Sequence, residues 1–302
     1  MLVQARGLGK SFGAHRAVND LSFDVKPGLV TGFLGPNGSG KSTTLRLMLG
    51  LDRGEGTTLF DGVALTDHPS VTRVVGTHLD AKLFHPQRTA RAHLRMMAAE
   101  ANIPDSRVDQ VIDLMGLHEV ARKRPKGFSL GMGQRLGLAG AVLADPQVLL
   151  LDEPANGLDP ATIHWLRDFL KHYASLGRCV LVSSHLLSEM ELMADEIIVI
   201  AKGELIANET ISQFVDRSTK NDIIFRVSEA DRFAAILRDK GFVVSDEGDN
   251  MAVVAQDTDT IGHIAFEHGI RVFELASRRA SLEEAFLEMT SGKQEYKTGD
   301  VK

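Results

Sequence analysis

The hydrophobic and polar positions of the chain follow two periods, one typical of buried strands and one typical of amphipathic helices. Short apolar runs in the first part predict three strands: Leu2 to Arg6, Ala17 to Val25 and Leu29 to Leu34. After Gly40 the apolar residues take up a helical period, which stops near Gly50. A strand, a glycine-rich connection and a helix are therefore expected in this order.

The middle of the chain continues this mixture of strands and helices. Helical spacing from Thr89 to Leu117, broken at Ile103-Pro104, predicts an inserted pair of helices, and another helix is expected from Pro160. Continuous apolar runs predict three strands buried on both faces: Val148 to Leu151, Cys179 to Val182 and Glu196 to Ile200. Strands that alternate with helices predict a mostly parallel sheet covered by helices on both faces.

The segment from Asp222 has an order of its own, which reads strand, helix, strand, strand, helix, strand. The expected strands are Ile223 to Val227, Phe242 to Ser245, Met251 to Ala255 and Ile270 to Leu275. This order predicts a small ferredoxin-like α+β domain over residues 222–292. Ser281 and Glu284 have the spacing of a capping box for a final helix, and residues 293–302 are expected to be a flexible tail.

Composition limits the classes of partner. The chain has 302 residues, 43% of them hydrophobic, and a formal net charge of -6. From residue 221 onward it carries 16 acidic and 10 basic residues, and the first 220 residues carry 24 of each sign. Neither part has the basic excess that a nucleic-acid binder uses, so no nucleic-acid partner is expected.

Cysteine content and hydropathy bear on the compartment. The single cysteine, Cys179, lies in an apolar run and is expected to be a buried structural thiol, which fits a reducing compartment. We find no signal peptide and no apolar stretch of the roughly 18 residues that a membrane span needs. We therefore expect a soluble, cytoplasmic protein that meets a membrane only through a partner.

A glycine-rich stretch after the third predicted strand carries the clearest chemical signal. Its sequence, GPNGSGKST, fits the phosphate-loop pattern, and it stands between a strand and a helix as that mechanism requires. Backbone amides and the helix N-terminus would face the phosphates of ATP, Lys41 would neutralise phosphate oxygens, and the Ser42 hydroxyl would ligate Mg²⁺. The motif comprises Gly35, Pro36, Asn37, Gly38, Ser39, Gly40, Lys41, Ser42 and Thr43. An ordinary glycine-rich turn is the alternative.

Acidic residues follow the buried run that ends at Leu151. Asp152 is placed to meet a Mg²⁺ held by Ser42, and Glu153 to polarise a water against the γ-phosphate. The alternative is that this Asp-Glu-Pro sequence merely ends a strand. His185, after the strand of Cys179, could reach the same phosphate, although taken alone it is more typical of an ordinary surface histidine.

Four motifs in this order, GPNGSGKST, FSLGMGQR, VLLLDEP and SSH, resemble the ATP-binding cassette of ABC transporters over roughly residues 1–215. The resemblance implies a P-loop NTPase fold with a RecA-like, mostly parallel core, an antiparallel β subdomain and a helical subdomain at about residues 85–145. It also implies two cassettes stacked head to tail, so that each ATP lies between the phosphate loop of one copy and the signature loop of the other.

Further site residues follow from the resemblance alone. Ser129 and Gly131 match the signature and would contact the γ-phosphate in the facing copy. Phe12, with Val18 nearby, matches the aromatic residue that stacks on adenine, although a lone Phe there could be core. Asp159, in the sequence NGLD, matches the acid of a loop that passes close to the facing site.

The chain departs from the family pattern at two places. The signature reads SLGMG where the common form is SGGQQ, a change that resembles cassettes of bacterial peptide-antibiotic and drug exporters. Asp80 stands where a glutamine usually senses Mg²⁺ and the attacking water, so Asp80 is a candidate for the nucleotide and metal site. The last segment, SLEEAFLEMT, resembles the carboxyl-terminal extension of such exporters.

The leading functional expectation is an ATP-hydrolysing subunit that docks on a separately encoded membrane permease and drives export of an antibiotic or other hydrophobic compound. Residues 80–92, including Phe84, Pro86 and Arg88, are expected to contact that permease. The alternative is a non-transport ATPase acting on a ribosome or DNA, but the chain has one cassette, no long heptad run and no basic surplus. A regulatory cassette without turnover is hard to reconcile with an intact Lys41, Asp152, Glu153 and His185.

Overall fold

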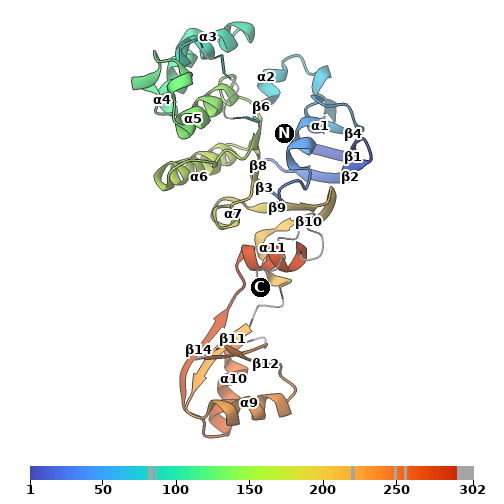
Figure 1. Cartoon of the computed structure of the whole chain (residues 1–302), viewed down its shortest axis with the longest axis vertical. Helices are drawn as coiled ribbons and strands as arrows, with labels where there is room; N and C mark the ends of the chain where they lie inside the picture. The colour runs from blue at the N-terminus through green and yellow to red at the C-terminus, as the bar shows by residue number, and fades with distance from the viewer. Residues whose placement is uncertain (81–83, 86, 219–221, 248–249, 255–256, 291–302) are drawn as a thin grey trace. The chain divides into compact units, whose positions relative to one another are not determined.

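The computed structural model describes residues 1–80, 84–85, 87–218, 222–247, 250–254 and 257–290. Contacts divide these residues into two compact units, with the division between Ile211 and Ser212 (Figure 1). The sequence suggests a boundary between residues 215 and 222. The division comes earlier because Ser212 and Asp216 both bond to Arg279 of the second unit.

A six-stranded sheet forms the centre of the first unit, in the order β10-β9-β3-β8-β7-β6. Five strands are mutually parallel and β10 pairs antiparallel to β9. The strands are β3 (Val30–Leu34), β6 (Val75–His78), β7 (Val148–Asp152), β8 (Cys179–Ser184), β9 (Glu196–Ala201) and β10 (Glu204–Thr210). Every residue of β3, β8 and β9 is buried, which is why these strands read as continuous apolar runs.

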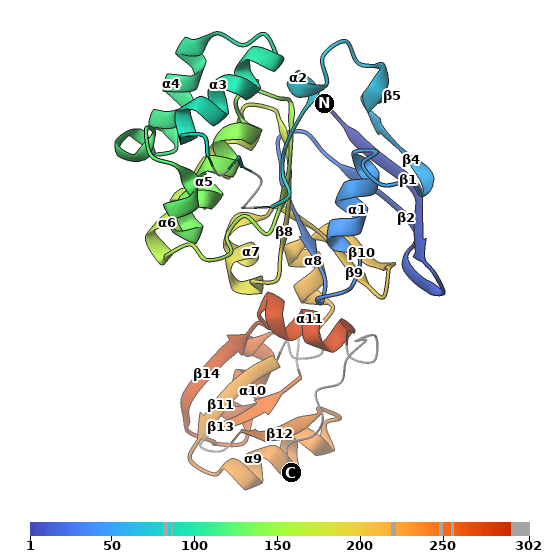
Figure 2. The same ribbon diagram turned by 45° about the horizontal axis from the view of Figure 1, so that its top comes forward.

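An antiparallel sheet, in the order β2-β1-β4-β5, lies beside this central sheet. Its strands are β1 (Val3–Phe12), β2 (His15–Val25), β4 (Glu55–Phe60) and β5 (Val63–Ala64). Helix α1 (Lys41–Met48) lies between the two sheets (Figure 2). Its buried Leu45 and Met48 join one core with Leu21 of β2 and Leu150 of β7. Helix α1, which follows the phosphate loop, therefore packs against both sheets and holds the loop in place.

The remaining helices of the first unit lie on the opposite face of the central sheet and at its β6 edge (Figure 2). The α-helices are α2 (Val71–Val74), α3 (Ala90–Glu100), α4 (Asp105–Leu114), α5 (Leu130–Ala141), α6 (Pro160–Ser175) and α7 (Leu187–Met193). Short 3-10 helices are η1 (Leu65–Asp67), η2 (His118–Val120) and η3 (Pro125–Gly127). The break expected at Ile103-Pro104 separates α3 from α4. Side chains of Thr89, Ser129 and Asp159 cap α3, α5 and α6 by accepting backbone N–H bonds.

The second unit is an antiparallel sheet covered by two helices. Its elements are α8 (Ile211–Asp216), β11 (Asp222–Val227), α9 (Ala230–Asp239), β12 (Val244–Glu247), β13 (Asn250–Val253), α10 (Thr258–Glu267), β14 (Val272–Arg278) and α11 (Leu282–Thr290). The strand order β12-β13-β11-β14 is that of a ferredoxin-like fold. Phe225 of β11 meets Phe233 of α9 edge to face in a core of its own, and the capping box of Ser281 and Glu284 is formed. The tail predicted to be flexible lies outside the described residues.

The predicted fold class is confirmed: a mostly parallel sheet, an antiparallel sheet, a helical part and a ferredoxin-like unit are all present. Cys179 is fully buried, its Sγ donates to the carbonyl oxygen of Met1 at 2.8 Å, and burial raises its pKa to about 12. It is a structural thiol, as the sequence predicts.

Candidate functional site

The phosphate loop connects the end of β3 to the start of α1. Gly40, the last residue before the helix, has a φ of 102°, and a Cβ at this position would collide with the carbonyl oxygen of Ala17. Glycine is required there for both reasons. The loop surrounds a pocket of about 250 Å³, lined by Ala17, Asn37, Gly38, Ser39, Gly40, Lys41, Ser42, Thr43 and Glu153.

Lys41 is a buried cation at the base of this pocket. Its Nζ donates to the carbonyl oxygens of Gly35 at 2.7 Å and Pro36 at 3.3 Å, and lies 3.9 Å from Glu153 Oε1. Burial lowers the pKa of Lys41, and the charges of Glu153 and Asp152 act against that shift. The Ser39 hydroxyl also lines the pocket, and it has no hydrogen-bond partner among the described residues. Both groups suit a phosphate anion.

Glu153 follows Asp152 at the carboxyl end of β7 in an uncommon backbone conformation. Its φ is 50°, in the left-handed region, which costs a non-glycine residue on the order of 1–3 kcal/mol. Ser183 of the neighbouring strand β8 holds this conformation. The N–H of Glu153 donates to Ser183 Oγ at 2.9 Å and to the Ser183 carbonyl oxygen at 3.2 Å, while the Ser183 hydroxyl donates to Asp152. Both acids are therefore fixed by one serine.

His185 completes the arrangement around the Glu153 carboxylate. His185 Nδ1 lies 2.7 Å from Glu153 Oε2, and the backbone N–H of His185 donates to the same oxygen at 3.3 Å. One carboxylate thus lies between a lysine on the phosphate loop and a histidine after β8. The His185 side chain is exposed but contacts the candidate catalytic acid directly, and its role at the γ-phosphate stays a prediction.

Phe12 and Val18 differ in their surroundings. The Phe12 side chain is 53% exposed, with Lys10 Nζ 5.1 Å from its ring centroid, so the alternative that Phe12 is core is excluded. Val18 is fully buried, and its Cγ2 would lie 3.4 Å from a Cβ at Gly40. The exposed Phe12 ring is available to stack on a base. Val18 packs against the phosphate loop at Gly40.

Three predicted residues lie away from the phosphate-loop pocket. Ser129 begins α5 and accepts the backbone N–H of Met132 at 3.2 Å. Gly131 follows in the first turn, close to Leu158. Asp159 begins α6, and hydrogen bonds from Thr162 to its carboxylate lower its pKa. None of the three lines the phosphate-loop pocket of its own chain. This is consistent with the expectation that they contact the nucleotide of a facing copy.

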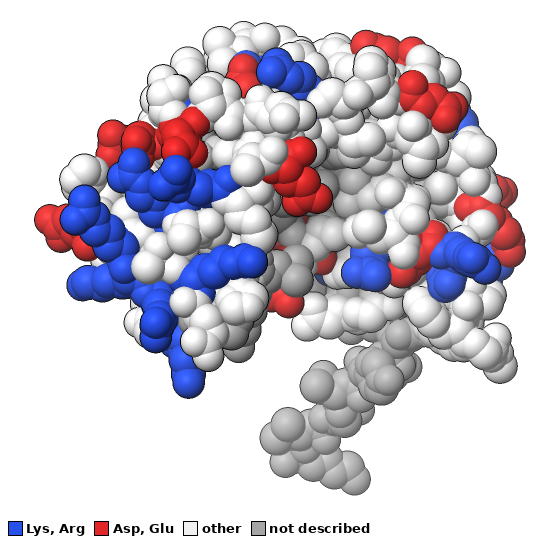
Figure 3. Space-filling model, turned by 90° about the horizontal axis from the view of Figure 1, so that it is seen from above, with Lys and Arg blue, Asp and Glu red and all other residues white. Residues whose placement is uncertain are grey.

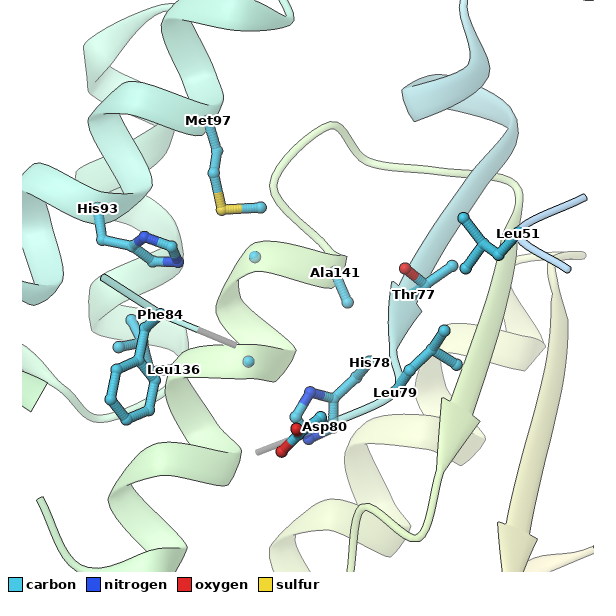
Figure 4. Close-up of a pocket in the computed structure, with 12 residues that line it drawn as sticks. Leu51, Thr77, His78, Leu79, Asp80, Phe84, His93, Met97, Leu136 and Ala141 are labelled. Carbon is cyan, nitrogen blue, oxygen red and sulfur yellow. The ribbon is translucent and has the colours of Figure 1, made fainter. Parts of the chain in front are cut away.

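Asp80 belongs to a different pocket. It is exposed and lines a cavity of about 250 Å³ between the central sheet and α3 and α5, together with His78, Phe84, His93 and Met97 (Figure 4). Neither Asp80 nor Asp152 lines the phosphate-loop pocket, and the role of Asp80 at the nucleotide and metal site stays a prediction. Pro86 of the predicted docking segment lies outside the described residues.

Sequence reasoning missed three residues that support the site: Ser183, Gln134 and His78. Ser183 and Gln134 lie within the motifs SSH and FSLGMGQR, which were quoted for other residues, and His78 lies two positions before Asp80; none carries a local signal of its own role. Their partners are 31, 19 and 56 positions away along the chain, so only the tertiary structure reveals the contacts.

The donors present fit a Mg²⁺ ion that is shared with a nucleotide. Mg²⁺ prefers oxygen ligands and usually takes one or two from the protein, with phosphates and waters supplying the rest. The exposed Ser42 hydroxyl and the Asp152 carboxylate are of this kind. The described residues contain no cluster of three or more His, Cys, Asp or Glu side chains that could hold an ion without the nucleotide.

The fold and the phosphate-loop site define a P-loop ATPase. The family model for the ABC transporter matches residues 18–156, and one for a domain of unknown function matches residues 222–283. An uncharacterized ABC transporter ATP-binding protein of Bacillus subtilis (strain 168), YhcH, is 35% identical over 96% of both chains. The bacitracin transport ATP-binding protein BcrA of Bacillus licheniformis is 31% identical over 96% of this chain and 98% of that protein.

A solved structure titled as the ATP binding subunit of an ABC transporter agrees with the fold, with a TM-score of 0.66, 25% identity, and coverage of 72% of this chain and 93% of that chain. The chain belongs to the ABC transporter ATP-binding proteins, and its activity is that of an ATPase. In the part of the chain that the structure describes, no helix is both long and apolar enough to cross a membrane.

Proposed function

We propose that this chain is the ATP-hydrolysing subunit of an exporter, which moves a peptide antibiotic or another hydrophobic drug out of the cell. It would act at the cytoplasmic face of the membrane through a separately encoded permease. Support comes from relatives that extend over both units and that are named for bacitracin transport. A lantibiotic transport ATP-binding protein of Streptococcus pyogenes, 31% identical over 74% of this chain, supports the same class of cargo.

The observation that carries the ATPase chemistry is the position of the Glu153 carboxylate between Lys41 and His185. Lys41 would neutralise phosphate oxygens, and Glu153 would polarise the attacking water. His185 would hold Glu153 in place and approach the γ-phosphate. Ser42 and Asp152 would hold Mg²⁺, which when bound supplies positive charge to the phosphates. Phe12 would stack on the adenine ring.

We infer further that two copies assemble head to tail. Ser129 and Gly131 would then meet the nucleotide held by the other copy, with Asp159 close to it. A charge pattern supports this. Lys and Arg side chains gather over the helical part in Figure 3, and four exposed cations shortly precede Ser129 in the chain: Arg122, Lys123, Arg124 and Lys126. Among the described residues these four have no ion-pair partner, so they remain available to a facing triphosphate.

The cavity beside Asp80 is the proposed docking site for the permease. Phe84 and Met97 supply apolar lining there, and the buried Nδ1 of His93 has no hydrogen-bond partner among the described residues. Burial lowers the pKa of His93, and the charges of Arg88 and His85 lower it further, which favours the neutral imidazole. A helix with apolar and hydrogen-bonding side chains would satisfy both features.

The dimer can be tested with two substitutions. Glu153→Gln keeps the shape of the side chain but removes the charge that polarises water, so ATP should remain uncleaved and the closed dimer should accumulate. Adding Gly131→Asp places a carboxylate where amides must approach a phosphate, and should dissolve that dimer. Among the described residues, a Cβ at position 131 would come within 3.5 Å only of the flexible end of Leu158, so the single chain should still fold and bind ATP.

Size-exclusion chromatography with ATP and Mg²⁺ measures the dimer, and titration with a fluorescent nucleotide measures monomer affinity. A double variant that stays fully dimeric would contradict the head-to-tail arrangement. So would a double variant that loses monomer affinity, because the signature loop would then serve its own chain.

The export function can be tested in cells that express the chain with its membrane partner. A tagged chain purified from detergent-solubilised membranes should bring down one integral membrane protein. Expression should raise resistance to at least one compound in a panel that includes bacitracin and a lantibiotic, and Glu153→Gln should abolish this resistance. Failure to recover a membrane protein, together with unchanged resistance, would reject export.

A further inference from the structure

A buried histidine lies at the point where the central sheet meets α5. His78 is the last residue of β6, pairs in register with Leu151 of β7, and is only 3% exposed. Figure 4 shows its ring at the floor of the cavity that Asp80 also lines. Gly137 of α5 makes room for this ring, because a Cβ at position 137 would collide with His78 Cε1 and Nδ1. No step of the proposed chemistry uses this side chain.

The histidine contacts a second buried polar residue, Gln134 of α5, which is 4% exposed. His78 Nε2 bonds to Gln134 Oε1. The amide group of Gln134 donates to two carbonyl oxygens, that of Glu153 at 3.4 Å and that of Asn156 at 3.2 Å. Because both carbonyls can only accept, the NH₂ group must face them and the amide oxygen must face the histidine. His78 therefore donates from Nε2, and the bond directions are set along the whole series.

These contacts reach the backbone that positions the candidate catalytic acid. The left-handed conformation of Glu153 is held at its N–H by Ser183 and at its carbonyl oxygen by Gln134 and by the N–H of Asn156. We propose that His78 and Gln134 are positioning residues for ATP hydrolysis: His78 orients the Gln134 amide, and Gln134 holds the peptide of Glu153 so that its carboxylate stays between Lys41 and His185.

The same residues give the docking cavity a direct physical connection to the catalytic acid. A partner side chain in the cavity beside Asp80 would contact the floor that His78 forms, one hydrogen bond from Gln134 and two from Glu153. Displacement of the imidazole would then release the Gln134 amide. This positioning role rests on the proposed role of Glu153 as the residue that polarises water.

The test compares six variants by ATP hydrolysis in the isolated chain. His78→Leu keeps similar volume without the donor, and Gln134→Met keeps similar length without the amide. Each should lower kcat about tenfold, the usual effect of losing one hydrogen bond that orders a reacting group. KM for ATP and the affinity for a fluorescent nucleotide should change less than about twofold, because neither residue lines the phosphate-loop pocket.

His78→Gln is the conservative variant, because its amide can donate in place of Nε2, and it should recover most of the lost kcat. The double variant of His78→Leu with Gln134→Met should be no slower than the slower single variant, since both act through one series of bonds. Exposed His172 of α6 provides the matched control: His172→Leu should leave kcat unchanged. Melting temperature and nucleotide binding establish that each variant is folded.

Glu153→Gln distinguishes the proposed catalytic role of Glu153 from the positioning role of His78 and Gln134. If it hydrolyses ATP normally, the proposed role of Glu153 fails and the positioning role fails with it. If it is inactive while His78→Leu and Gln134→Met keep normal kcat, the positioning role alone is overturned. Equal losses in His78→Leu and His78→Gln, or losses in the two single variants that multiply in the double variant, would also overturn it, because they indicate independent packing effects.

Discussion

The two walls of the proposed nucleotide site are built in different ways. The phosphate loop is one continuous segment, and its conformation depends mainly on its own glycines and on the helix that follows it. The wall that carries Glu153 is held by side chains from two other parts of the chain: Ser183 and His185 at the end of β8, and Gln134 of α5. We call the first the local wall, because neighbouring residues in the chain determine its structure. We call the second the tertiary wall, because contacts between distant parts of the chain hold it in place.

This difference separates binding from turnover. The local wall presents amides and a buried cation to phosphates, so it can bind a nucleotide whatever the exact position of Glu153. The tertiary wall positions the Glu153 carboxylate, and this position changes whenever β6, α5 or β8 shifts. We expect substitutions in the first wall to reduce affinity and substitutions in the second to reduce kcat at nearly constant affinity.

The largest effect is expected from Lys41→Met. Loss of a charge-assisted phosphate contact removes about 1.5 to 3 kcal/mol of binding free energy, which corresponds to roughly tenfold to a hundredfold in affinity, and turnover should fall at least as far. Because burial lowers the pKa of Lys41, the charged form is disfavoured in the fold. Without nucleotide, the variant should melt no lower than the unmodified chain at neutral pH.

Fluorescent-nucleotide titration and thermal unfolding, with and without ATP, check both parts of this prediction. The exposed lysine Lys171 supplies the control: Lys171→Met should leave affinity and melting temperature unchanged. If Lys41→Met binds nucleotide with normal affinity, the phosphate loop is not part of the binding site, and the comparison of the two walls no longer holds.

The same difference explains how much the sequence alone could predict. The phosphate loop and the order of strands and helices in the ferredoxin-like unit follow from local patterns, so the sequence predicts them, although strand bounds such as those of β12 and β14 shift by about two residues. The left-handed conformation of Glu153 and the bonds from Gln134 and His78 were not predictable, because they join segments far apart in sequence. Asp80 shows the same limit: no local pattern indicates that it lines a cavity with His78, and its role at the nucleotide site stays a prediction.

An intermediate effect is expected from Ser183→Ala, which tests the tertiary wall without touching a candidate catalytic group. The variant loses the hydroxyl that accepts from the Glu153 N–H and donates to Asp152, although the backbone carbonyl of residue 183 still accepts. We expect kcat to fall by roughly tenfold, with nucleotide affinity nearly constant. Ser184→Ala is the matched control, since the neighbouring Ser184 hydroxyl accepts from the backbone N–H of Leu186 and makes no hydrogen bond to either acid among the described residues. A drop in affinity as large as the drop in kcat would contradict the separation of the two walls.

The smallest effect is expected when the second unit is removed. If both walls belong entirely to the first unit, a chain that ends at Ile211 should bind nucleotide within about twofold of full length, because no described residue beyond 211 lines the phosphate-loop pocket. The two hydrophobic cores support this, since Phe225 and Phe233 belong to one and Leu45 and Leu150 to the other. Titration of the truncated chain measures affinity, and circular dichroism checks that it is folded. A folded truncated chain that has lost nucleotide binding would mean that the second unit contributes to the local wall, and affinity and turnover could no longer be assigned to separate parts of the first unit.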